Sequence, residues 1–171
     1  LWGDSSSVHG LKLAACCRWS SRSTSVRRCE RLGQILRLWE NRRVEEYELL
    51  LRHAAAWARG RKRTLDAELV ALTLRLRADH DDLPANQWPA GSAEHLMLVR
   101  WPAHGPSDSP DVDALVQSLD TLWSFLRSTG RMAAASAQPA QLRREAKKAA
   151  PKMAAACADE SRFGTAKQLL G

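Results

Sequence analysis

The segment between Ser109 and Gly130 constrains the fold more than any other part of the chain, because it carries a start signal, a stop signal and an unbroken apolar stripe for one helix. Ser109 is suited to cap the first turn, Pro110 fits the first helical position, and Gly130 supplies the stop. Asp111 and Asp113 favour the positive end of the helix dipole. The apolar residues recur at steps of three and four and therefore share one face: Val112, Leu115, Val116, Leu119, Leu122, Trp123 and Leu126. We predict a helix over residues 109–129, with Leu119 and Trp123 buried.

The composition favours helix over sheet. Apolar residues make up 44% of the 171 residues, but most are Leu and Ala, with two Phe and one Tyr. No apolar run approaches the roughly 20 residues that cross a bilayer, so we expect a soluble protein without a membrane partner. We predict an all-α single domain, a bundle of about five or six helices over residues 29–171. Residues 1–28 are rich in Ser and Arg, which predicts a disordered segment or a poorly folding, non-native leader.

Helical periodicity also fills the first half of the chain. A helical stripe runs from Cys29 to Gly60, with a shift of phase near Asn41 that leaves one long helix or two shorter ones open. Thr64 is suited to cap the next helix, in which leucines recur at steps of three and four. The run 79–91 is acidic and then rich in Pro, Asn and Gly, so it predicts a loop.

Three more segments follow in the second half. Ser92 begins a short apolar segment that we interpret as a helix stopped by Pro102, although its Leu-Met-Leu-Val run also suits a strand. A longer helix begins near Pro139, presents a narrow face of small residues and is expected to kink at Pro151. Asp159 is suited to cap a last helix. No turn follows that helix, which suits a truncated C-terminus.

The N-terminus and the cysteines give indications about processing of the chain and about the cellular compartment of the protein. The chain begins at Leu1 rather than Met, which favours an incomplete reading frame. The short apolar run near this end is interrupted by Lys12 and does not match a secretory signal. The cysteines lack the spacing of metal-binding pairs, and adjacent cysteines rarely bridge each other: Cys16, Cys17, Cys29 and Cys157. We therefore expect a reduced, cytoplasmic protein.

The enzymatic candidate with the most specific chemistry is a set of imidazoles and carboxylates. His53, then His80 with Asp81, then Asp113 or Asp120 follow one another along the chain. This order resembles the helical HD-domain phosphohydrolases, in which such ligands hold a divalent metal that activates water. In that family the His-Asp pair lies inside a buried helix, whereas here it closes a helix ahead of a proline. A solvated loop is therefore the simpler interpretation, and no cofactor or metal is expected.

Charge is distributed unevenly along the chain. Residues 1–63 carry 14 Lys and Arg against 6 Asp and Glu, residues 64–136 carry 5 against 10, and residues 137–171 carry 7 against 3. Two basic clusters are candidates for phosphate contacts: Arg59, Arg61, Lys62 and Arg63, and at helical spacing Arg143, Arg144, Lys147 and Lys148. Because no recognition helix with a defined turn accompanies them, solvated helix faces are the favoured interpretation.

The seven tryptophans divide into two groups. Trp39, Trp57 and Trp123 fall on apolar stripes and are predicted to lie in the core. Trp88 and Trp101 lie beside prolines at loop edges, where they are candidates to rim a pocket or a partner site.

One pattern carries a resemblance to a known group of proteins. The pattern is Trp123-x-Phe125-Leu126-x-x-Thr129-Gly130-Arg131, followed by Asp159 and Phe163-Gly164-x-Ala166-Lys167-x-Leu169. Over residues 110–171 it resembles the carboxy-terminal part of uncharacterised helical proteins from high-GC bacteria. The resemblance implies a helical fold and no mechanism.

The sequence therefore favours a non-enzymatic interaction or regulatory protein with a protein partner. The alternative is a nucleic-acid-binding protein that uses the clusters at 59–63 and 143–148. A metal phosphohydrolase is the third hypothesis. Convergence of the two basic clusters on one face favours the second hypothesis, and convergence of His53, His80 and Asp81 favours the third.

Overall fold

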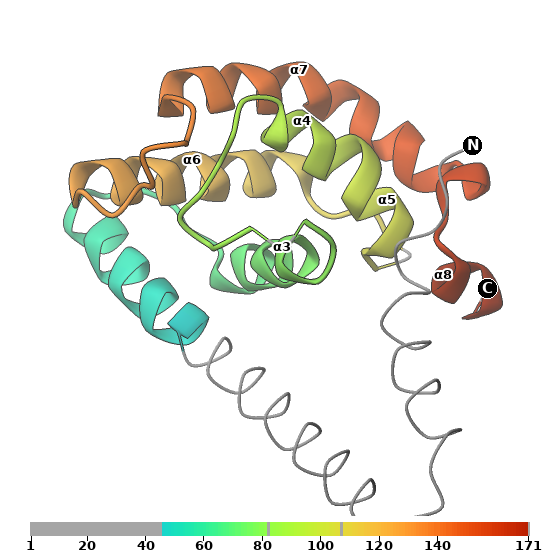
Figure 1. Cartoon of the computed structure of the whole chain (residues 1–171), viewed down its shortest axis with the longest axis horizontal. Coiled ribbons are helices and arrows are strands. Elements are labelled where there is room, and N and C mark those ends of the chain that lie inside the picture. Colours follow the sequence, from blue (N-terminus) through green and yellow to red (C-terminus); the bar gives the residue numbers. More distant parts are fainter. Residues whose placement is uncertain (1–45, 82, 107, 171) are drawn as a thin grey trace, which may run out of the picture. The chain divides into compact units, whose positions relative to one another are not determined.

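The computed structural model describes residues 46–81, 83–106 and 108–170, and every regular element in these residues is helical (Figure 1). The predicted all-α class is confirmed. Residues Tyr47–Gly171 form one compact unit. The predicted leader at 1–28, Trp39 and the start of the domain at residue 29 lie outside the described residues, so these predictions stand as predictions.

This unit is built from one pair of long helices and shorter elements around it. After a helix at 46–60 come α3 (Ala67–His80), α4 (Ser92–His95), the π-helical segment η1 (Leu96–Arg100), α5 (Trp101–His104), α6 (Val112–Ser128), α7 (Pro139–Ala158), the 3₁₀ turn η2 (Glu160–Arg162) and α8 (Thr165–Leu170). In Figure 1, α7 lies along α6, and both α4 and α5 pack against α7. Helix α3 packs against α6 and η1.

Helix α6 supplies the centre of the core. Leu119 and Trp123 are fully buried, which confirms the predicted stripe. Helix α7 packs against α6 and also against α4, η1 and α5. It buries Leu142, Met153 and several alanines, and small side chains such as alanine allow close packing. The predicted small-residue face of this helix is therefore the face that packs.

Two helices begin later than the sequence predicts. Asp111, not Ser109, caps α6, and its carboxylate accepts a hydrogen bond from the amide of Ala114 at 3.0 Å. Asp66, not Thr64, caps α3 in the same way. A carboxylate accepts the free amides and also neutralises the positive end of the helix, so it is favoured over a nearby hydroxyl. The stop of α6 is confirmed, since Gly130 has the left-handed φ of +67° that glycine tolerates.

Pro102 does not stop the helix that begins at Ser92. The chain passes through the π-helical segment η1 and continues helically to His104. Proline lacks the amide that would bond to the carbonyl of Leu98, four residues earlier. Arg162 takes over that role, because its guanidinium NH1 donates to the Leu98 oxygen at 3.1 Å. The strand alternative for this segment is wrong, and Pro151 also stands inside a helix, α7.

The tryptophans at the loop edges belong to the core. Trp88 and Trp101 are 0% and 1% exposed, so the prediction that they rim a pocket is wrong. Trp88 meets Trp123 edge to face, with ring centroids 5.3 Å apart. The guanidinium carbon of Arg77 lies over the Trp88 ring, 3.8 Å from its centroid. The loop folds inward because the amide of Ala137 donates to the carbonyl of Trp88. Trp57, predicted in the core, is partly buried against it.

Candidate functional site

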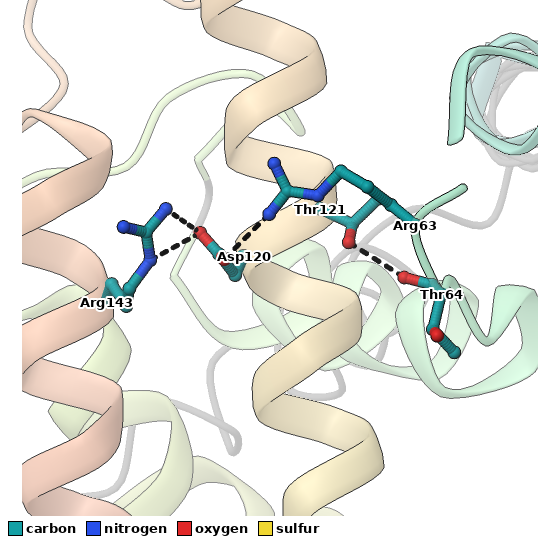
Figure 2. A network of polar contacts seen from close by, with 5 residues as sticks. All are labelled: Arg63, Thr64, Asp120, Thr121 and Arg143. Carbon is teal, nitrogen blue, oxygen red and sulfur yellow. Dashed lines mark hydrogen bonds and ion pairs between the residues drawn. The ribbon is translucent and has the colours of Figure 1, made fainter. Parts of the chain in front are cut away.

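Asp120 on α6 joins the two predicted basic clusters. Its Oδ2 accepts a hydrogen bond from Arg63 NH2 at 2.8 Å, and its Oδ1 accepts from Arg143 Nε at 2.8 Å and from Arg143 NH2 (Figure 2). The Asp120 side chain is only 18% exposed. One residue of each cluster is therefore held against the same largely buried carboxylate.

The turn that carries Arg63 is fixed to α6 beside this carboxylate. Thr121 donates its hydroxyl to the backbone carbonyl of Thr64 at 2.7 Å, as Figure 2 shows. One helical turn earlier, Ser118 accepts a hydrogen bond from the amide of Asp66 at 2.8 Å. These two bonds come from positions one helical turn apart on α6, so the position of Arg63 is set by the neighbouring backbone as well as by Asp120.

A surface groove runs over this part of the molecule. Its larger hollow has a volume of about 430 Å³ and lies between α6 and α7, and its smaller hollow of about 140 Å³ lies between α6 and the turn at 63–64. Gln117 and Asp120 line both hollows. The remaining lining residues are Arg63, Thr64, Asp113, Val116, Thr121, Arg143, Lys147 and Ala150. We call this feature the Asp120 groove.

The Asp120 groove combines cationic walls with an acidic floor. Arg63 stands on one side of α6, and Arg143 and Lys147 stand on the other. A guanidinium has five N–H donors, so Asp120 leaves donors of both arginines for other acceptors. Among the residues that the structure describes, neither Lys147 nor Asp113 is in an ion pair. The site is therefore suited to bind charged groups at defined positions.

The other members of the two basic clusters do not form a continuous cationic face. Arg61 lies over the ring of Trp57, 4.3 Å from its centroid, and Lys148 pairs with Glu94 at 3.5 Å. Arg59, Lys62 and Arg144 are exposed. The two clusters therefore meet through Arg63 and Arg143, with the carboxylate of Asp120 between them.

The candidate metal ligands take other partners. His53 Nδ1 lies 3.2 Å from Arg131 NH1, His80 stacks on a second histidine, and Asp81 pairs with Arg100 at 2.7 Å. Within the described part of the chain, no three His, Cys, Asp or Glu side chains are placed to hold a metal ion. The arrangement that the phosphohydrolase hypothesis requires is therefore not formed by these residues.

The sequence pattern identified the three cations of the groove, Arg63, Arg143 and Lys147, but not the carboxylate that links the two arginines. Asp113, Gln117 and Asp120 are spaced four and three apart, so they share one face of α6 opposite its apolar stripe. That polar stripe, next to two basic clusters, is the signal that points to the groove. The partner of Asp120 across 57 residues could not be read from local spacing.

No family model, no curated protein and no solved structure matches the chain. The resemblance over residues 110–171 is therefore still a prediction. In the part of the chain described here, none of the helices combines the length and apolar character that crossing a lipid bilayer requires.

Proposed function

We propose that this protein is a non-enzymatic, cytoplasmic interaction protein that binds an acidic segment of a protein partner in the Asp120 groove. The observation that carries the proposal is the fixed position of two guanidinium groups around one largely buried carboxylate. Side chains that are already ordered lose little conformational entropy when a ligand binds. Arg63 and Arg143 are ordered in this way before any partner arrives.

The lining of the groove favours a protein over a nucleic acid. Val116 and Ala150 offer apolar contact beside the cations, a mixture typical of protein interfaces. A protein segment can place an acidic side chain at Lys147 while its other side chains avoid Asp113 and Asp120. A phosphodiester backbone carries a charge at every nucleotide, so the same carboxylates would repel it.

The charge balance of the region from residue 46 onward agrees with this choice. Residues 46–171 carry 17 Lys and Arg against 15 Asp and Glu. Long-range attraction of a polyanion depends on net positive charge, and of the chain's net charge of +7 only +2 lies in these residues. The free thiol of Cys157, buried at the end of α7, fits the reducing compartment that we propose.

The proposal is tested with a fluorescein-labelled peptide of Ala and Leu that carries Glu at every fourth position, so that its acids share one helix face. We call it the acidic probe. We expect it to bind the full chain in the micromolar range, more weakly as salt increases, and a matched peptide with Gln in place of Glu to bind at least about tenfold more weakly. Fluorescence polarisation measures both affinities.

Charge reversal inside and outside the groove separates the hypotheses. Lys147→Glu should weaken binding of the acidic probe by about tenfold, whereas Lys152→Glu, on an exposed position of the same helix outside the groove, should have a much smaller effect. Equal losses in the two variants would contradict the proposal. Tighter binding of a duplex DNA of mixed sequence than of the acidic probe, lost equally in both variants, would favour the nucleic-acid alternative.

A further inference from the structure

Two histidines outside the Asp120 groove form a stacked pair. The rings of His80, at the end of α3, and His104, at the end of α5, have centroids 3.6 Å apart and an angle of 14° between their planes. Both residues are half-buried. Two neutral imidazoles stack favourably at this distance, whereas two imidazolium ions repel each other.

His104 also contacts the C-terminal segment, which we define as residues 159–170. A Cβ added to Gly164 would lie 2.9 Å from His104 Cε1 and 3.0 Å from its Nδ1, so only glycine fits against this edge of the ring. The amide of Gly164 donates to the carbonyl of Ala103 at 3.0 Å. The position of this ring and the position of the segment therefore depend on each other.

Lys167 fastens the same segment on both sides of His104. Its Nζ donates to the carbonyl of Pro102 at 3.1 Å and to that of Pro106 at 3.2 Å, two residues before and two residues after the histidine. Together with the Arg162 bond to the Leu98 carbonyl, this covers the C-terminal end of the helix that α5 completes. The segment is held mainly by backbone carbonyls around one imidazole.

The charges around the pair oppose its protonation. Arg100 donates to the His80 carbonyl at 3.1 Å and pairs with Asp81, while Lys167 and Arg162 approach from the C-terminal segment. Among the described residues, Asp79 in the last turn of α3 and Asp81, which follows the end of α3, are nearby anions, and Asp81 is already paired with Arg100. Burial, then Arg100, lowers the pKa of His80, and burial, then His80 and Arg100, lowers the pKa of His104.

We propose that the stacked pair of His80 and His104 is an acid-sensitive latch, which holds the C-terminal segment on α5 when both rings are neutral and releases it when they are protonated. Release moves His104 out of the stack and away from Gly164. The carbonyl end of α5 is then uncovered.

The direction of the pH response follows from the lowered pKa values. A histidine without these neighbours has a pKa of 6.5, so the released form takes up protons at a higher pH than the latched form does. The latch is therefore complete above about pH 6.5 and weakens as the pH falls through the lowered pKa values.

The test is amide hydrogen exchange of the full chain at about pH 7.5 and about pH 5.5, with rates corrected for the pH dependence of chemical exchange. We expect the protection of the C-terminal segment to fall by at least about tenfold at the lower pH, while α6 keeps its protection. His80→Gln removes one titrating ring of the pair, so the difference between the two pH values should shrink to about twofold or less.

Two further variants control the experiment. His95→Gln, at an exposed histidine on α4, should leave the pH response unchanged. Gly164→Ala should lower the protection of the C-terminal segment at both pH values, because its Cβ cannot fit against His104. Equal protection at both pH values in the unaltered protein, a full response retained in His80→Gln, or an equal loss of protection in α6 would each overturn the proposal.

Discussion

At the scale of single residues, Asp120 organises the candidate site. One carboxylate accepts hydrogen bonds from arginines that come from two different elements, the turn after the helix at 46–60 and α7. Each arginine is partly exposed, with 33% and 38% of its side chain accessible, while the carboxylate between them is more buried. The arrangement orders Arg63 and Arg143 and still leaves them accessible to a ligand.

Asp120→Asn should destabilise the protein, because the amide keeps the shape but loses the charge and one acceptor oxygen. We expect a loss of about 1–3 kcal/mol in the free energy of unfolding, measured by urea denaturation with tryptophan fluorescence. Asp113→Asn is the matched control on the same face of α6, and it should change that free energy by less than about 0.5 kcal/mol. Equal effects of the two changes would show that the ion pairs do not stabilise the fold.

At the scale of helices and turns, local sequence signals predicted most helices but not all of the residues at which they begin and end. The apolar stripe of α6 and its stop at Gly130 depend on neighbours within a turn, so the sequence reveals them. The passage of the helix through Pro102 depends on Arg162, which lies 64 residues from the carbonyl that it satisfies. Local spacing contains no information about such a partner.

The correction at the start of α3 gives a direct test. Asp66→Ala should lower the free energy of unfolding by about 0.5–2 kcal/mol, because its carboxylate accepts the amides of Glu68 and Leu69 at 3.0 Å. Thr64→Ala should cost less than about 0.5 kcal/mol, since the contact of Thr64 with α6 is made by its backbone carbonyl. Urea denaturation of both variants measures these free energies. A larger loss of free energy of unfolding in Thr64→Ala than in Asp66→Ala would indicate that Thr64 is the cap.

At the scale of the whole molecule, tertiary contacts decide what the sequence left open. The sequence located the two basic clusters, yet only the packing of α7 along α6 brings Arg143 to Asp120. In the same way, the burial of Trp88 depends on its edge-to-face contact with Trp123, 35 residues away in the sequence. The periodicity of apolar residues was sufficient to predict the fold class. The candidate site could not be predicted in this way, because it depends on how the helices pack against one another.

Truncation of one buried side chain in the core should destabilise the protein. Leu119 is 0% exposed, so Leu119→Ala should reduce the free energy of unfolding by about 2–5 kcal/mol through lost apolar burial and the cavity left behind. Leu169→Ala changes a side chain that is 81% exposed and should cost less than about 0.5 kcal/mol. Urea denaturation measures both values. Similar losses of free energy of unfolding in the two variants would contradict the placement of α6 at the centre of the core.

The measurement that tests the central claim most directly is amide chemical-shift mapping of the full chain during titration with the acidic probe. A ligand in the Asp120 groove should shift the amides of residues 113–121 and 143–150 and of the turn at 63–64 most strongly. In Lys147→Glu these shifts should shrink at the same peptide concentration, because one cationic wall has changed sign. Largest shifts outside these three stretches, or identical shifts in Lys147→Glu, would contradict binding in the groove.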